Sequence, residues 1–219
     1  MRATVLLILL CFSATFHVWS LNTNPDYLVY SYNNLVVHHA FWTLITTLFI
    51  HANLSHLLGN MLFLFLFGWP LEKIIGSQKL VLVFLLGGIL SLLLSHFFYA
   101  PEEPIVGASG SICALIATLM IFDPWRFSFL LILFPMPLAV AGLTYVLYNF
   151  VMAIYERQHP DANTLHIAYE VHVAGFIVGL VMGCIWNPNW KKNLLVSILI
   201  FIGYYVVIGL VAYLFLHHR

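Results

Sequence analysis

The chain has 219 residues, of which 63% are hydrophobic and only 7% are charged, and its formal net charge is zero. A soluble domain carries nearer ~25% charged residues and cannot hide so much apolar surface in one core. The composition therefore predicts an integral membrane protein surrounded by lipid, and the zero net charge gives no basis for nucleic-acid binding.

The sequence predicts seven membrane-spanning helices, because a helix needs roughly 20 apolar residues to cross a bilayer. The predicted spans are 3–21, 54–73, 78–99, 108–122, 129–153, 168–187 and 193–216. The fourth is shorter than usual, which is typical of a helix that begins below the membrane surface, with its first turn inside a protein cavity. The predicted fold class is an all-α polytopic membrane protein.

Two segments near the N-terminus need a separate interpretation. The first span begins like a signal peptide, with Arg2 ahead of an apolar run, but no clear cleavage site follows, so we expect it to be retained. Segment 22–53 is too long for a tight turn. Its apolar stretch 40–50 is too short to span and predicts an interfacial helix within a structured loop.

The positions of the basic residues predict the orientation of the chain. With the N-terminus in the cytoplasm, only Arg157 and Arg219 lie outside, which fits the usual excess of lysine and arginine in cytoplasmic loops. The second, fourth and sixth spans then run inward from the outer face. The basic residues on the cytoplasmic side are Arg2, Lys73, Lys79, Arg126, Lys191 and Lys192.

Polar residues gather at the outer ends of these three inward-running spans. Such groups are costly below the membrane surface and usually line a protein-enclosed cavity. We therefore expect one site at this depth, open to the extracytoplasmic side. Its candidate members are His51, His56 and Asn60 on the second span, Ser109 on the fourth and His172 on the sixth.

These residue types predict the active site of a serine hydrolase. A serine hydroxyl is a poor nucleophile until a base takes its proton, which makes Ser109 the nucleophile and His172 the base. His56 and Asn60 are spaced i, i+4 on one helix face and, with the backbone N–H of Ser109, can stabilise an oxyanion. No acidic residue lies at this depth, so we expect a Ser-His dyad and not a Ser-His-Asp triad.

Small residues predict close packing between the fourth and sixth spans. Gly175 and Gly179 belong to a GxxxG pattern that shares a helix face with His172, and Gly110 and Ala114 make a small face on the fourth span. Small faces let helix backbones approach closely. That approach would bring the serine near His172.

Each element alone has a simpler interpretation. A GxSG run or a glycine series is common in membrane helices, and a lone buried histidine usually bonds a carbonyl. No metal or other cofactor is predicted, because His51 and His56 are spaced i, i+5 and no carboxylate or cysteine joins them. The cysteines, Cys11, Cys113 and Cys184, lie in apolar segments and are interpreted as small buried hydrophobes.

In combination, these residues resemble the rhomboid family of intramembrane serine proteases over about residues 1–187. The resemblance rests on His51–Asn60 (HANLSHLLGN), on the GxSG motif at Gly107–Gly110 (GASG), on the HxxGxxxG motif at His172–Gly179 (HVAGFIVG) and on Glu72–Ser77 (EKIIGS). It implies a six-helix core, residues 1–190, with residues 191–219 as an added C-terminal transmembrane helix.

The resemblance also implies roles for the motif residues. Ser109 would be the nucleophile and His172 the general base, and His56, Asn60 and the Ser109 amide would hold the oxyanion. Structural support would come from Gly107, Gly110, Gly175 and Gly179. The family cleaves single-span membrane proteins near the outer face, prefers a small residue before the cut and a helix that unwinds readily, and needs no metal or ATP.

Two positions depart from the pattern of the family. Many members place a tyrosine four residues after the nucleophile, where it packs on the catalytic histidine, and here Cys113 stands there. The positioning of His172 would then depend on another aromatic residue. The Trp-Arg pair of many members is Trp42-Thr43 here, which removes a charge that anchors the loop.

Two rival functions come from other classes. A non-catalytic rhomboid-like protein would bind membrane clients and pass them on, but such relatives usually lack the serine or the histidine. A small transporter would use the same cavity, but no mid-membrane carboxylate is present. The short loops favour a prokaryotic cell membrane, and no pattern specifies an oligomeric state.

Overall fold

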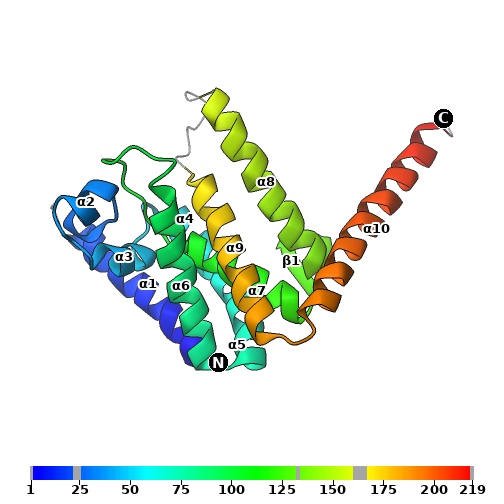
Figure 1. Ribbon diagram of the computed structural model, residues 1–219, viewed down its shortest axis with the longest axis horizontal. Helices are drawn as coiled ribbons and strands as arrows, with labels where there is room; N and C mark the ends of the chain where they lie inside the picture. Colours follow the sequence, from blue (N-terminus) through cyan, green and yellow to red (C-terminus); the bar gives the residue numbers. More distant parts are fainter. Residues whose placement is uncertain (1, 22–25, 132–133, 160–166, 218–219) are drawn as a thin grey trace.

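The structure is a bundle of helices, shown in Figure 1, and the computed structural model describes residues 2–21, 26–131, 134–159 and 167–217. Within these ranges, six helical segments are long and apolar enough to cross a membrane, and a shorter apolar helix, α7 (Ser109–Phe122), lies among them. The chain is therefore a multi-pass membrane protein, and the predicted all-α polytopic fold is confirmed. The six segments are α1 (Arg2–Ser20), Leu54–Ile75, α6 (Ser77–Ser95), α8 (Leu138–Gln158), α9 (Tyr169–Trp186) and α10 (Trp190–His217).

The second span changes its hydrogen-bonding pattern halfway along. It consists of α4 (Leu54–Phe63), a π-helical turn η3 (Leu64–Gly68) and α5 (Trp69–Ile75). The π turn ends at Gly68, two residues before Pro70, which has no N–H and whose ring would clash with the carbonyl four residues earlier in a regular helix. The wider turn lets the span continue past the proline.

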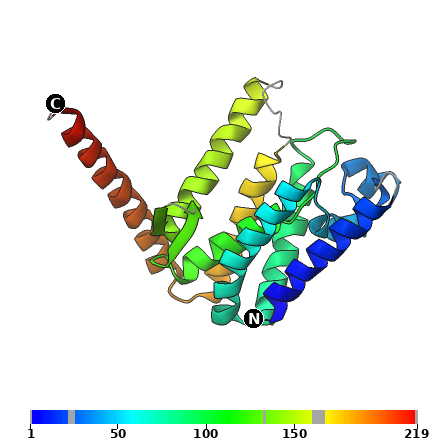
Figure 2. The same cartoon turned by 180° about the vertical axis from the view of Figure 1, so that it is seen from behind.

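A buried carboxylate joins the first three spans at the end of the bundle where α1 begins (Figure 2). Glu72 accepts hydrogen bonds from the backbone N–H groups of Ala3 and Thr4, each at 3.0 Å, and from Ser77 Oγ at 2.7 Å. The first N–H groups of a helix have no partner inside the helix, and their positive end attracts an anion. Glu72 therefore caps α1 from α5 and also binds the start of α6.

The loop between the first two spans folds into short helices and is tied to the segment before α7. The loop helices are η1 (Asp26–Leu28), α2 (Tyr32–Val36), α3 (Thr43–Thr46) and η2 (Thr47–Phe49), and residues 22–25 of the expected loop lie outside the described residues. Thr47 Oγ1 donates to Ile105 O, and Gly107 N donates to Thr47 O at 3.0 Å. The single interfacial helix expected over 40–50 is thus divided into two short pieces.

The short helix α7 occupies the centre of the bundle and packs against both α6 and α9 (Figure 1). Its residues from Gly110 to Ile121 are all buried. A helix of 14 residues is about 21 Å long at 1.5 Å per residue, which is shorter than a hydrocarbon core of about 30 Å. Asn187 Nδ2 and Asn193 Nδ2 donate to Ile121 O at 2.7 and 2.8 Å. These amides satisfy a carbonyl at the end of the helix, where lipid offers no partner.

Glycines bring the backbones of α7 and α9 into direct contact. A Cβ added to Gly175 would lie 2.1 Å from Gly110 O, and one added to Gly179 would lie 2.1 Å from Ala114 O. Thr118 Oγ1 donates to Gly179 O at 2.9 Å across the same contact. The two helices therefore meet along the small faces that the sequence contains.

The predicted fifth span, 129–153, is wrong in its first part. Residues Phe127–Leu131 and Phe134–Pro137 form the strands β1 and β2 of an antiparallel pair, and α8 begins only at Leu138. Proline has no N–H and disfavours a helical conformation in the residue before it, so Pro135 and Pro137 delay the helix. Residues 132–133 of the predicted span lie outside the described residues.

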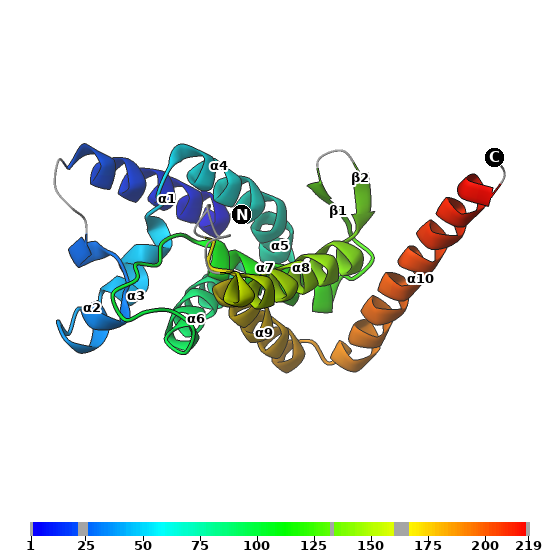
Figure 3. The same cartoon turned by 90° about the horizontal axis from the view of Figure 1, so that it is seen from above.

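The last helix, α10, extends away from the rest of the bundle (Figure 3). It contacts α8 and α7, and Thr144 Oγ1 of α8 lies 2.8 Å from the Oη of Tyr205, in the middle of α10. Most of its apolar side chains are exposed and, in a bilayer, face lipid.

We expect Gly179→Ala to lower the thermal unfolding temperature of the purified protein in detergent. The added methyl would clash with backbone atoms of Ala114, which cannot move without separating α7 from α9. Overpacking of this kind costs about 1–3 kcal/mol. The matched control is Gly203→Ala on α10, where an added Cβ meets no atom within 4 Å. Equal unfolding temperatures for the two variants would contradict the importance of this contact.

Candidate functional site

Ser109 is the first residue of α7 and is half-buried. Gly107, two residues earlier, has φ +109°, a conformation that favours glycine. A Cβ on Gly107 would also lie 2.8 Å from both Cε1 and Nε2 of His56. Gly107 therefore makes the turn that leads to the serine and leaves room for the His56 ring beside it.

His172 on α9 is buried and held by two side chains of α8. Its Nδ1 lies 2.6 Å from Asn149 Oδ1 and 3.5 Å from Tyr145 Oη. The Tyr145 ring is stacked on the imidazole at an angle of 29°, with 6.1 Å between ring centroids. The aromatic partner of His172 thus comes from α8, while Cys113 of α7 lies against the Tyr145 hydroxyl.

Ser109 and His172 lie at neighbouring positions of the α7–α9 contact. A Cβ on Gly110 would be 3.0 Å from Val171 Cγ1, and each of these residues is next in sequence to a candidate catalytic residue. Among the hydrogen bonds of the described residues, none joins Ser109 Oγ to His172. Catalytic hydrogen bonds are often long before substrate binds and tighten in the complex.

His56 and Asn60 occupy consecutive turns of α4. Asn53 Oδ1 caps the helix by accepting from His56 N at 2.9 Å, and Asn60 Nδ2 donates to His56 O at 2.9 Å. That bond uses one of the two N–H groups of the Asn60 amide, and the second N–H can still donate to another acceptor. His56 lies near enough to His172 for their charges to interact. The described residues contain no group of three His, Cys, Asp or Glu side chains that could hold a metal.

His51, which the sequence placed among the candidate site members without a specific role, supports the turn before Ser109. It is 1% exposed, its Nδ1 lies 3.2 Å from Thr15 Oγ1, and Ala108 N donates to its Nε2 at 3.5 Å. The Thr15 hydroxyl donates to Phe49 O, so it accepts from Nδ1–H of His51 and leaves Nε2 as the acceptor. Its ring also meets the His56 ring edge-on, with 5.1 Å between centroids.

Asn149 and Tyr145 were not predicted from the sequence. Both lie on the span whose boundary was misplaced, and they are spaced i, i+4, so they share one helix face. An asparagine within an apolar span is itself a signal, because polar groups at membrane depth need a partner. Nothing in its spacing indicated that the partner would be His172.

Taken together, the fold and the site define a multi-pass membrane protein with a serine at the start of a short central helix and a buried histidine on the helix packed against it. The Rhomboid domain family profile matches residues 38–189, which is more than half of the chain. The chain belongs to the rhomboid family.

Curated relatives have the same family name. The chain is 28% identical to Rhomboid-related protein 2 of Mus musculus over 63% of this chain and 45% of the relative. It is 33% identical to Rhomboid protease GluP of Bacillus subtilis (strain 168) over 40% of this chain and 17% of the relative. It is 40% identical to RHOMBOID-like protein 2 of Arabidopsis thaliana over 36% of this chain and 25% of the relative. The matched regions span less than half the length of these relatives.

We expect protonation of His51 to destabilise the protein as the pH falls. The pKa of His51 is lowered to about 4, mainly by burial and in smaller part by the charge of His56, while the hydrogen bond involving the Phe49 backbone acts in the opposite direction. The unfolded chain, with an ordinary histidine pKa of about 6.5, therefore binds the proton first. Stability is fully present above about pH 6.5 and is lost between about pH 6.5 and 4.

The measurement is the thermal unfolding temperature in detergent across this pH range. His51→Gln should flatten part of the decline, because glutamine does not titrate, and replacing the exposed His38 by glutamine should leave the decline unchanged. A decline of equal size in wild type and His51→Gln would contradict the assignment.

Proposed function

We propose that the chain is an intramembrane serine endopeptidase that cleaves transmembrane proteins near the extracytoplasmic face. The observation that carries the proposal is the junction of α7 and α9. Ser109 begins the recessed helix α7, and His172 lies beside it with Nδ1 already bonded to Asn149. The second imidazole nitrogen, Nε2, is thereby left to accept a proton. A relative named as a rhomboid protease adds support.

In the proposed reaction, Ser109 Oγ attacks the scissile carbonyl carbon and His172 Nε2 takes the hydroxyl proton. The oxyanion that forms accepts hydrogen bonds from Ser109 N–H, His56 and Asn60. His172 then gives its proton to the leaving amine, and an acyl-enzyme remains on Ser109. Water attacks the acyl carbon, again with His172 as base, and releases the second product.

The substrate in this proposal is a transmembrane helix that unwinds at its outer end. Backbone carbonyls inside a helix are hydrogen-bonded and shielded, so the scissile bond becomes accessible only in unwound chain. The substrate approaches laterally from lipid, beside the second and fifth spans. The proposed orientation is supported by the basic residues, whose distribution favours the start of α7 on the extracytoplasmic side.

We expect the wild type, and not Ser109→Ala, to cut a single-span substrate co-reconstituted in liposomes. The alanine variant has no nucleophile, while its helix contacts through Gly110 remain. Reaction with a fluorophosphonate probe should likewise need Ser109. Two folded proteins that neither cut nor react would exclude the protease and leave the client-binding function.

We expect Asn60→Ala to retain more activity than Ser109→Ala. Loss of one oxyanion donor lowers the rate of a soluble serine protease by about 10²–10³-fold, and His56 and the Ser109 amide remain as donors. The comparison is the initial cleavage rate in liposomes, with unfolding temperature as the folding control. Equal loss in the two variants, with folding intact, would contradict this division of roles, in which His56 and the Ser109 amide compensate for Asn60.

A further inference from the structure

We infer that Asn149 is a positioning residue of the catalytic site, so that the functional unit is Ser109–His172–Asn149 and not a two-residue pair. The inference rests on the proposed protease function. It concerns a residue on α8, outside the three motifs that carry the family resemblance.

The contacts of Asn149 fix which nitrogen of His172 has the hydrogen. Asn149 Nδ2 donates to Tyr145 O at 2.8 Å, which directs the amide oxygen of the same side chain toward the histidine. Asn149 Oδ1 lies 2.6 Å from His172 Nδ1 and can only accept, so Nδ1 is the protonated nitrogen. Nε2 then has the free lone pair that a general base requires.

Asn149 is buried, so its polar atoms pair with groups inside the bundle. It is 1% exposed, whereas its neighbours in sequence, Tyr148 and Phe150, are 54% and 53% exposed on the outside of the bundle. An unpaired amide inside a membrane protein costs free energy, and this one is satisfied by a helix carbonyl on one side and by His172 on the other. One residue thus directs the imidazole from the side opposite to its catalytic nitrogen.

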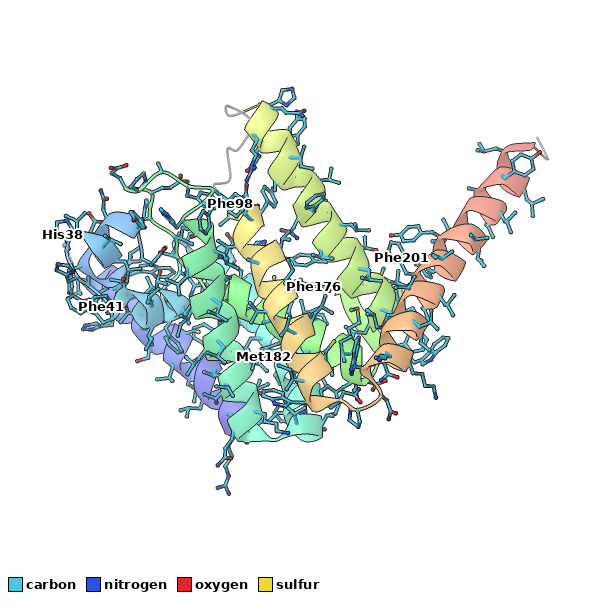
Figure 4. All side chains as sticks on the ribbon, in the orientation of Figure 1. His38, Phe41, Phe98, Phe176, Met182 and Phe201 are labelled. Carbon is cyan, nitrogen blue, oxygen red and sulfur yellow. The ribbon has the colours of Figure 1, made fainter. Side chains whose placement is uncertain are left out.

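Besides the contact between Asn149 and His172, helix α8 contacts α9 at a second place, where α8 ends and α9 begins. Arg157 Nε lies 3.4 Å from Glu170 Oε1, and the Arg157 guanidinium lies 4.7 Å from the centre of the Phe98 ring. Phe98 lies at the top of the bundle beside the start of α9 (Figure 4). Tyr99 Oη donates to the other oxygen of Glu170 at 2.5 Å. These contacts hold the end of α8 and keep Asn149 opposite His172.

A neutral amide orients the imidazole without attracting its positive form. The groups that face His172 are Asn149 and Tyr145 from α8 and His56 from α4, and Cys113 from α7 reaches it only through Tyr145. None of them is a carboxylate. A carboxylate in place of the amide would keep the hydrogen bond and also stabilise the imidazolium, as in a Ser-His-Asp triad.

The test compares Asn149→Leu, Asn149→Asp and the lipid-facing control Phe150→Leu in liposomes. Readouts are kcat and KM for a single-span substrate, the rate of fluorophosphonate labelling of Ser109, and the unfolding temperature. We expect Asn149→Leu to lower kcat and the labelling rate by about 10²-fold, within the range that general-base catalysis supplies. KM should stay unchanged, and Phe150→Leu should behave as the wild type.

The aspartate variant separates a positioning role from a merely structural one. Asn149→Asp should restore labelling to within about tenfold of the wild type and move the acidic limb of the pH profile of kcat/KM upward by about one unit, the size of an opposite-charge effect. Labelling of folded Asn149→Leu at the wild-type rate would overturn the inference. So would equal loss in the leucine and aspartate variants without a change of the pH profile.

If the protease function itself is wrong, the same cleavage and labelling measurements give a different pattern from the one that overturns only the role of Asn149. In that case the wild type and Phe150→Leu would neither cut nor label, and the inference would fall with the protease function. A wild type that labels normally, with a leucine variant that labels equally well, would overturn only the role of Asn149.

Discussion

The direct backbone contact between α7 and α9 is the constraint on which the candidate site depends. Gly175 lies over Gly110 O, and Gly179 lies over Ala114 O, so any side chain at either glycine would push the two helices apart. Lipid offers no hydrophobic force between helices, and their association rests on close packing and on bonds such as that from Thr118 to Gly179. The separation of Ser109 and His172 is therefore set by backbone geometry and not by the flexibility of their side chains.

The sequence identified the parts of the site that are unusual for a membrane segment. Burying histidine, asparagine and serine side chains at one depth of the membrane costs free energy, so such a group indicates a functional cavity. The shortness of the fourth span predicted a helix that begins inside the protein. The fifth span was misplaced because its apolar content outweighed Pro135 and Pro137, whose backbone restrictions decide where α8 begins. Hydropathy alone does not distinguish a short hairpin of apolar residues from the first turns of a helix.

Contacts between distant segments were beyond the reach of sequence reasoning. Asn149 and Tyr145 precede His172 by 23 and 27 residues, and their pairing with it depends on how α8 lies against α9. His51 was visible as a polar residue at the right depth, but its bonds to Thr15 and to the Ala108 amide require the first span and the loop before α7 to be in place. The replacement of an aromatic residue by Cys113 is likewise understood only once Tyr145 is seen beside it.

Two side-chain amides at the C-terminal end of α7 determine how far the chain could be shortened from its C-terminus without loss of core contacts. Asn187 and Asn193 both donate to Ile121 O, but Asn187 ends α9 whereas Asn193 belongs to the first turn of α10. A protein shortened at residue 190, the limit suggested by counting six core helices, would lose one of these two donors from the most buried helix of the bundle. Shortening after Ser197, whose hydroxyl bonds Asn193 O, would retain both. The first turn of the last helix is therefore part of the core of the bundle.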